Sequence, residues 1–352
     1  MVKRWLTTFR GLVCSGFVRK LGETEAGAIM TKPKILLTRK WPESVEKAAA
    51  ELFDVTYNPE DRPMNWAEMR VALESYDAVL ATVTDDVKTG TFTNLKPMAR
   101  ILANYGVGFS HIDVEGARAA GITVTNTPDV LNDCTADLAM TLLMMAARRA
   151  GEGEREVRAG NWTGWRPTHM IGTSVTGKTL GIIGFGRIGQ AMARRAHFGF
   201  GMKILAQSRS PVDPAILAQT GAVQVDTVED LLPQCDFISL HCPGGDVNRH
   251  LINADRLAMM KPTAILVNTA RGEVVDEAAL AEALKTGVIA GAGLDVFEAE
   301  PTVHPGLLEC ENAVLLPHMG SSTRETRVEM GMRALKNIQQ FFDGAMPDDQ
   351  VN

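Results

Sequence analysis

Short apolar segments alternate with amphipathic ones along most of the chain. From Lys34 onward, apolar runs lie within residues 34–40, 77–83, 99–106 and 122–128, and helical patterns separate them, for example at 44–53, 67–75 and 111–121. Apolar strands that alternate with helices are typical of parallel βα units. The first part of the chain is therefore predicted to form a parallel sheet covered by helices.

A second and longer series of apolar runs begins near Thr179. The runs lie within residues 179–186, 203–209, 236–242, 264–270, 290–297 and 313–318, with amphipathic stretches such as 276–287 between them. This series predicts a larger doubly wound sheet. The last helical stretch, 323–344, is expected to return to the first sheet. We therefore predict an α/β protein in which a Rossmann dinucleotide-binding domain, residues 131–318, is inserted in a flavodoxin-like substrate domain, residues 31–130 and 319–352.

Two segments between these series have unusual patterns. Residues 134–149 are apolar on nearly every face of a helix, so we expect this helix to be buried all round, either where the chain crosses between the domains or in a dimer interface. Residues 160–178 are rich in Gly, Thr and Trp, and this composition predicts a long loop.

The composition narrows the range of partners. With 352 residues, 45% of them hydrophobic, the chain is long enough for two domains, and its net charge of −6 provides no broad attraction for nucleic acid or anionic membranes. Neither is expected as a partner. The cysteines are scattered without metal-ligand spacing, so we expect reduced thiols, no metal and a reducing compartment such as the cytoplasm. They are Cys14, Cys134, Cys235, Cys242 and Cys310.

The N-terminal extension, residues 1–30, differs from the rest. Five basic residues precede the first acidic one, and the absence of a long apolar core excludes a transmembrane span. One interpretation is an organelle-targeting segment. The other is an extension without a role in the fold, because Met30 is followed directly by what resembles the start of a cytosolic α/β protein.

A glycine motif lies between an apolar strand and a helix in the second series. Gly184-Phe185-Gly186-Arg187-Ile188-Gly189 follows TLGII and opens RIGQAMARRA, which is the context that a dinucleotide-binding motif requires. Gly184 would permit the tight turn, Gly186 would let the backbone approach the pyrophosphate, and Gly189 would let the helix pack closely on the strand.

The next strand bears on the choice of cofactor. It ends in Ser208 and Arg209, where an NAD site normally has an acidic residue. A hydroxyl and a guanidinium can bind a 2′-phosphate, which a carboxylate would repel. The residues favour NADP, with NAD still possible. The alternative is a solvated arginine at a strand end.

Three polar residues each follow an apolar run: Arg271, Glu300 and His318. A cation can bind an anionic keto acid, an imidazole can transfer the proton that accompanies hydride transfer, and a carboxylate can stabilise the imidazolium. Together they indicate a nicotinamide-dependent oxidoreductase. Taken singly, Arg271 could pair with Asp276, Glu300 could be a loop charge, and His318 could be a histidine satisfied at a strand end.

Five motifs follow one another along the chain: GFGRIG, LHCPGG, LVNTARGEVVDEAAL, AGAGLDVFEAEP and LLPHMGSST. In these motifs and their order, residues 34–345 resemble the D-isomer-specific 2-hydroxyacid dehydrogenase family, and most of all its glyoxylate/hydroxypyruvate reductases. The resemblance implies that Arg271 binds the substrate carboxylate and carbonyl, that His318 protonates the developing alkoxide, and that Glu300 pairs with His318. It also implies reduction of glyoxylate or hydroxypyruvate to glycolate or D-glycerate, in a homodimer.

Further site residues follow from the same motifs. Asp295 is expected to bind the nicotinamide carboxamide, and the main-chain N–H groups of Tyr105-Gly106-Val107-Gly108 are expected to form an anion-binding nest for the substrate. Asp113 is interpreted as a helix-start residue. The remaining cofactor-side candidates are Thr135, His241, Cys242, Pro243, Thr269, Ala270 and Gly320.

Other functions remain open at this point. Another 2-hydroxyacid specificity, lactate-type or phosphoglycerate, is the first alternative; a phosphorylated substrate would need further basic residues near Gly106, where residues 82–87 offer Asp85 and Asp86 instead. Formate oxidation is disfavoured, because such relatives have Gln at the position of Glu300. A nucleotide-sensing corepressor is the alternative from a different class.

Overall fold

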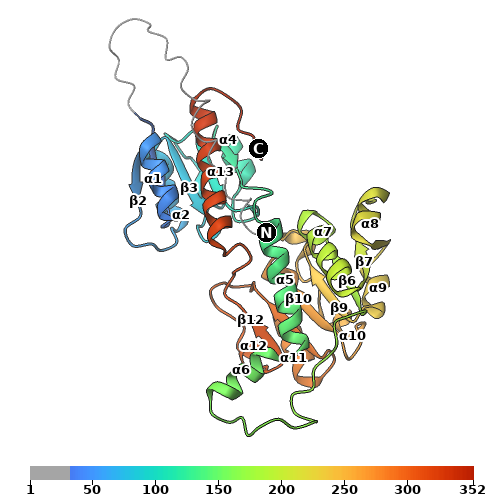
Figure 1. The fold of residues 1–352 in the computed structure, drawn as a ribbon. Helices are drawn as coiled ribbons and strands as arrows, with labels where there is room; N and C mark the ends of the chain where they lie inside the picture. The colour runs from blue at the N-terminus through green and yellow to red at the C-terminus, as the bar shows by residue number, and fades with distance from the viewer. Residues whose placement is uncertain (1–31) are drawn as a thin grey trace, which may run out of the picture. The chain divides into compact units, whose positions relative to one another are not determined.

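The first sheet is built from five parallel strands near the start of the described chain (Figure 1). The computed structural model describes residues 32–352, so the interpretations of residues 1–30 and of Cys14 lie outside it. The strands are β1 Lys34–Leu37, β2 Asp54–Tyr57, β3 Ala78–Thr82, β4 Ile101–Tyr105 and β5 Thr123–Thr125, in the order β2-β1-β3-β4-β5. The helices are α1 Glu43–Leu52, α2 Trp66–Ser75, α3 Thr89–Phe92, α4 Val114–Ala119 and the late helix α13 Arg324–Phe342.

Side chains alternate between the two faces of this sheet, and helices cover both. Ile35 and Leu37 of β1 pack on one face with residues of α1 and α13, whereas Leu36 packs on the other face with residues of α2. The predicted return of the last helix to the first sheet is confirmed by its packing on β4 and α1. Residues beyond α13 cover the edge strand β5, where the N–H of Val351 donates to the carbonyl of Val124 at 2.9 Å.

The second sheet has seven parallel strands in the order β12-β11-β10-β9-β6-β7-β8. They are β6 Thr179–Ile183, β7 Lys203–Gln207, β8 Ala222–Val225, β9 Phe237–Leu240, β10 Ile265–Asn268, β11 Gly291–Leu294 and β12 Ala313–Leu315. The helices are α5 Asn132–Ala147, α6 Ala150–Arg158, α7 Arg187–Arg194, α8 Pro214–Thr220, α9 Val228–Leu231, α10 Ala254–Ala258, α11 Glu277–Thr286 and α12 Pro305–Leu308. A π-helical turn, η1 Arg195–Gly199, extends α7, and short 3₁₀ turns occur at η2 Leu232–Gln234, η3 Asp246–Asn248 and η4 Gly272–Val274.

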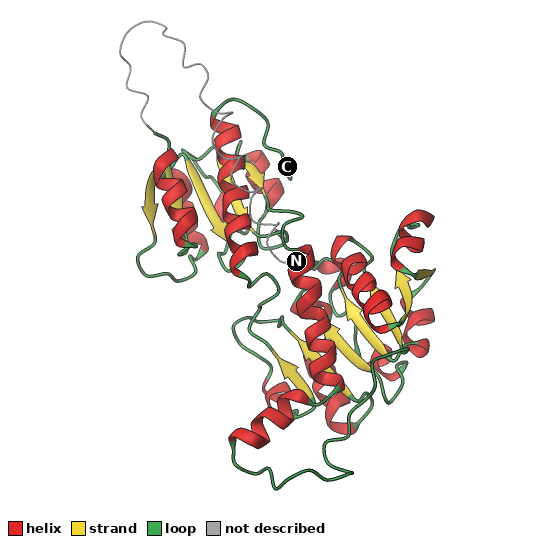
Figure 2. Ribbon diagram, in the orientation of Figure 1, coloured by secondary structure: helices red, strands yellow, loops and turns green. Residues whose placement is uncertain are grey.

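Helices also cover both faces of the second sheet. Figure 2 shows α5 and α7 in front of its strands, and their buried residues form one core cluster with Leu180, Ile182 and Phe237. Residues of α9, α10 and α11 form the cluster on the opposite face. The strand order reverses at β6, which pairs with both β7 and β9. The predicted fold class, two doubly wound parallel sheets, is confirmed.

The domain boundaries at residues 130/131 and 318/319 stay a prediction. The strands of the first sheet lie within residues 34–125 and those of the second within 179–315, and contacts join residues 33–352 into one unit. Within the described range, no helix is both long and apolar enough to span a bilayer.

The expectation that the apolar helix is buried all round is wrong for the single chain. α5 packs one face against β10, β11 and α7. A stripe at Asp137, Thr141 and Met144 is exposed, and Met144 keeps 40% of its surface in contact with solvent. The predicted loop is confirmed, because residues 161–178 contain no helix or strand. Of the cysteines in the described chain, Cys235, Cys242 and Cys310 are buried, Cys134 is half-buried, and all four are free thiols.

Candidate active site

A cavity of about 1100 Å³ lies where the carboxyl ends of strands from both sheets meet. Polar residues in open α/β sheets collect at such ends, since parallel strands end on the same edge. The predicted residues that line it are Tyr105, Gly106, Val107, Gly108, Thr135, Ile188, His241, Cys242, Pro243, Thr269, Ala270, Arg271, Asp295, Glu300, His318 and Gly320. Gly184, Phe185, Gly186, Arg187, Gly189, Ser208 and Arg209 do not line it.

His318 and Glu300 are hydrogen-bonded, with 2.8 Å between Nδ1 of the imidazole and Oε2 of the carboxylate. The other carboxylate oxygen accepts a bond from the N–H of Phe297 at 3.0 Å. Burial opposes ionisation of Glu300, but the bond from His318, the charge of His318, the Phe297 N–H and Arg271 together hold its pKa below the usual value. Because Nδ1 is occupied, Nε2 is the ring nitrogen of His318 left for the cavity.

The turn after β12 is held by Asp295. This side chain is 1% exposed, and its two oxygens accept bonds from the N–H groups of Met319 at 2.6 Å and Gly320 at 2.8 Å. The hydroxyl of Thr135 donates to the carbonyl of Gly320 at 3.0 Å. His318 itself has a left-handed backbone, φ 53°, and its N–H donates to the carbonyl of Asp295 at 2.9 Å. Residues predicted separately as cofactor ligands thus also position the histidine.

Arg271 carries a half-buried charge without a carboxylate partner among the described residues. Its guanidinium donates to the carbonyl of Ala270 at 2.7 Å, and it forms no ion pair with any residue of the described range. Burial lowers its pKa, and the nearby carboxylates of Glu300 and Glu273 oppose that shift. Pairing with Asp276, the alternative raised by the sequence, is excluded: Asp276 caps the N-terminus of α11 instead.

The glycine loop after β4 has the hydrogen bonding of an anion-binding nest. The side-chain amide of Asn104 donates to the carbonyls of Gly106 and Gly108, both at 3.0 Å, and Asn126 donates to the carbonyl of Val107 at 2.9 Å. The N–H groups of Val107 and Gly108 have no hydrogen-bond partner within residues 32–352. A carboxylate can bind main-chain N–H groups that have no other partner, and the hydrogen bonds to the carbonyls of the loop hold these N–H groups in position.

The glycine motif after β6 fits a dinucleotide. Gly184 has φ 92°, and any side chain there would overlap the backbone of His241 and Cys242. A Cβ on Gly186, the N-cap of α7, would point into open space, whereas one on Gly189 would overlap the carbonyl of Gly184. The structure therefore has a left-handed turn, an open approach to the N-terminus of α7 and a tight helix contact, in that order.

Ser208 and Arg209 follow β7 directly, as the sequence predicts. Arg209 is exposed, and its side chain forms no hydrogen bond or ion pair with the rest of the described chain. Arg187 of the glycine motif is placed differently, because its Nε lies 2.9 Å from a carboxylate oxygen of Asp129. Its side chain is paired with the segment between β5 and α5.

Two buried histidines near the cavity are neutral at ordinary pH. Burial lowers the pKa of His241 to about 4, and its Nε2 lies 2.9 Å from the hydroxyl of Ser239. Burial, then the charges of Arg271 and Lys88, lower the pKa of His111 to about 4. Neither is suited to donate a proton near neutral pH. His111 was not predicted as a site residue, and its buried Nε2 has no partner in the described range.

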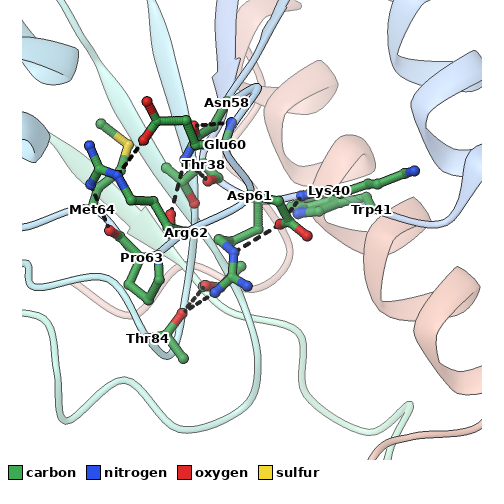
Figure 3. A network of polar contacts seen from close by, with 12 residues as sticks. Thr38, Lys40, Trp41, Asn58, Glu60, Asp61, Arg62, Pro63, Met64 and Thr84 are labelled. Carbon is green, nitrogen blue, oxygen red and sulfur yellow. Dashed lines mark hydrogen bonds and ion pairs between the residues drawn. The ribbon is translucent and has the colours of Figure 1, made fainter. Parts of the chain in front are cut away.

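Residues from turns of the first sheet also line the cavity and were missed. Arg39, Lys40, Asp61 and Thr84 lie after β1, after β2 and after β3 (Figure 3). Residues 82–87 were expected to place the acidic side chains of Asp85 and Asp86 near Gly106, and this expectation is wrong for Asp85. This carboxylate is buried, and it accepts bonds from the hydroxyl of Thr38 and the N–H groups of Thr82 and Met64.

A pair of glutamates positions the loop that carries Glu300. Glu298 accepts a bond from the N–H of Glu277 at 3.1 Å, and Glu277 accepts one from the N–H of Glu298 at 2.7 Å. Nε2 of His250 lies 2.9 Å from the second oxygen of Glu298. This reciprocal pairing joins the loop after β11 to the start of α11. The motif EAEP contains one of these residues, but spacing alone does not show which glutamate faces the histidine.

Comparison with known proteins identifies the family. Residues 140–320 match the profile described as D-isomer specific 2-hydroxyacid dehydrogenase, NAD binding domain. A glyoxylate reductase of Thermococcus litoralis is 45% identical over 325 residues, which cover 91% of this chain and 97% of that protein. The chain belongs to the D-isomer-specific 2-hydroxyacid dehydrogenase family. It is an NAD(P)-dependent oxidoreductase, as the motifs predict.

Solved structures of other family members have the same fold. A glyoxylate reductase from Paecilomyes thermophila superposes with a TM-score of 0.81 at 33% identity, covering 92% of this chain and 99% of that one. An NADPH-dependent glyoxylate/hydroxypyruvate reductase from Sinorhizobium meliloti, solved with NADP and malonate, gives a TM-score of 0.80 at 34% identity, covering 91% and 97%.

In this dehydrogenase, Gly108→Ala should cost at least about 100-fold in kcat/KM, because the new methyl group would overlap the Arg271 guanidinium and displace it. Steady-state kinetics with a 2-keto acid substrate measures the loss. Gly199→Ala is the matched control, since a Cβ there meets no atom within 4 Å. Equal activity of the two variants would contradict the close packing of Arg271 on the glycine loop.

Proposed function

We propose that this enzyme reduces glyoxylate or hydroxypyruvate with NADPH, giving glycolate or D-glycerate. The observation that carries the proposal is a single cavity holding the His318–Glu300 pair, the unpaired Arg271 and the nest at Val107 and Gly108. The names of the glyoxylate reductase relatives support the same substrate class.

The chain's own residues divide the work of carbonyl reduction. Arg271 and the N–H groups of Val107 and Gly108 bind the substrate carboxylate, and Arg271 also polarises the carbonyl. The bound nicotinamide supplies the hydride that reaches the keto carbon. The keto oxygen takes the proton from Nε2 of His318, while Glu300 accepts the Nδ1–H and orients the ring.

Residues around the cavity would hold the cofactor. The open approach at Gly186 fits the pyrophosphate, and Asp295 would accept a bond from the nicotinamide carboxamide, which sets the ring face presented to the substrate. The remaining residues proposed for cofactor binding are Gly184, Phe185, Arg187, Ile188, Gly189, Thr135, His241, Cys242, Pro243, Thr269, Ala270 and Gly320.

The wild-type enzyme should turn over glyoxylate or hydroxypyruvate in preference to pyruvate and 3-phosphohydroxypyruvate, in assays with both nicotinamides.

His318→Ala should lower kcat by at least about 100-fold, because it removes the proton donor. Glu300→Gln should also lower kcat, but by less, because Nε2 of His318 is kept while the carboxylate that orients the ring is lost. Near-normal turnover by His318→Ala would exclude the histidine as the donor.

NADPH is the proposed cofactor because Ser208 and the unpaired Arg209 follow β7. Ser208→Asp should shift the ratio of kcat/KM values toward NADH, since the carboxylate repels a 2′-phosphate and can bind a ribose hydroxyl. Ser208→Ala is the matched control: it removes the same hydroxyl without adding charge, and it should not improve the use of NADH. An unchanged cofactor ratio in Ser208→Asp would refute this assignment.

The enzyme should assemble as a homodimer through its cofactor domain. Large apolar side chains on α5, α6 and the following loop are exposed in the single chain, among them Met144, Val157 and Trp165, the last at 83%. Light scattering should give about twice the 38.1 kDa of one chain. Trp165→Ser should weaken the assembly. A monomeric wild-type protein at micromolar concentration would contradict the proposal.

A further inference from the structure

Arg39 lies just after β1 on the wall of the cavity, and its guanidinium is held by two neighbours. Nε donates to a carboxylate oxygen of Asp61 at 3.0 Å, and Nη1 donates to the hydroxyl of Thr84 at 2.9 Å. The same oxygen of Asp61 accepts the N–H of Lys40 at 2.9 Å. Figure 3 shows Asp61, Lys40 and Thr84 of this network. The side chain of Arg39 is 27% exposed, so it is a largely covered group with a defined orientation.

One end of this guanidinium is unused. Nη2 of Arg39 has no hydrogen-bond partner within residues 32–352, although it carries two N–H donors. A covered donor without a partner has lost part of its contact with water, so an acceptor on a ligand restores a bond that the protein alone does not make.

Arg39 reaches the substrate site through a short series of contacts. A Cβ on Gly106 would lie 3.3 Å from a methyl group of Val83, and the next residue, Thr84, binds Arg39. On its other side, the glycine loop packs against the Arg271 guanidinium at Gly108. The nest therefore contacts Arg271 directly and Arg39 through Val83 and Thr84, and all of these residues line the same cavity. A keto acid whose carboxylate is bound by Arg271 and the nest would have Arg39 on the wall of the cavity that holds it.

The charges indicate which group Arg39 recognises. Its positive charge is paired with Asp61, whose pKa is lowered first by the hydrogen bond from the Lys40 N–H and then by Arg39. A cation that already has a carboxylate partner attracts a second anion weakly, yet its remaining N–H groups still donate to a neutral oxygen. Arg271, by contrast, has no such partner and is suited to the carboxylate.

We infer that Arg39 is a specificity-determining residue that donates from Nη2 to the hydroxyl on the third carbon of hydroxypyruvate, and so selects 2-keto acids with a hydroxyl at that carbon. This inference rests on the proposed reduction of glyoxylate or hydroxypyruvate. Glyoxylate has no third carbon and pyruvate has only a methyl group there, so neither uses the interaction.

The test compares Arg39→Met with wild type on three substrates. Its kcat/KM for hydroxypyruvate should fall by about tenfold or more, the value of a hydrogen bond to a charged donor, while glyoxylate and pyruvate change by less than about threefold. Arg62→Met is the matched control. Arg62 follows Asp61 in the loop after β2 and pairs with Glu60 and Glu68, but it does not line the cavity, so all three substrates should keep their wild-type values.

Thr84→Val provides a second variant that keeps Arg39 but removes one of its anchors. It should cause a smaller loss, again confined to hydroxypyruvate. An equal loss for all three substrates in Arg39→Met, or no loss, would overturn the inference. Oxaloacetate, which carries a carboxylate in place of the hydroxyl, is assayed as a fourth substrate, and a loss confined to it would overturn the hydroxyl assignment in favour of an anion. Failure of the proposed function is a separate result, because it is seen in the wild-type enzyme, which would then not prefer glyoxylate or hydroxypyruvate to pyruvate.

Discussion

A half-buried guanidinium without a carboxylate partner in residues 32–352 is the feature on which the site depends. Arg271 is held by the carbonyl of its neighbour Ala270, and its nearest carboxylates contribute charge without forming an ion pair. An unpaired buried charge is unfavourable, so an anionic substrate that completes the pair gains the interaction that the free protein lacks. The neutral His111 beside it adds no second charge. Gly108 leaves the space that the guanidinium occupies.

Side chains that bind main-chain groups hold the reacting residues in place. His318 sits on a turn whose N–H groups are bound by Asp295, and Glu300 sits on a loop whose N–H groups are bound by Glu277 and by Glu300 itself. The nest is held from behind by Asn104 and Asn126. Each of these side chains binds the backbone near the end of a strand, where small displacements would otherwise separate the reacting donor and acceptor. Rigidity at these turns is therefore built by buried carboxylates and amides.

Sequence patterns revealed every strand of the two sheets except one edge strand of each. The strands found as apolar runs are flanked by other strands or covered on both faces, whereas β2 and β8 were missed. Both are edge strands of four residues, and their sequences, DVTY and AVQV, are only partly buried, so they lack a continuous apolar signal. The exposed stripe of α5 was missed for a different reason. The sequence of this helix is apolar enough to predict complete burial, but its apolar residues are not all covered within one chain.

The residues of the site also divide into those that the sequence predicts and those that it does not. Arg271, Glu300 and His318 follow strands in recognisable motifs, and the cavity brings them together. Arg39, Asp61 and Thr84 come from turns that carry no motif, and only the folded chain reveals that they meet. The burial of Asp85 could not be predicted from its neighbours either, since two of its donors, Thr38 and Met64, come from distant parts of the sequence.

The packing of α13 also has a consequence for how the protein is made. Met330, Leu335 and Ile338 complete one face of the first sheet, and residues 350–352 cover its edge at β5. All strands of the second sheet lie earlier, within residues 179–315. During synthesis, the second sheet can therefore close while the first still exposes an apolar face and an open edge. The substrate half, although it begins first, is expected to finish folding last.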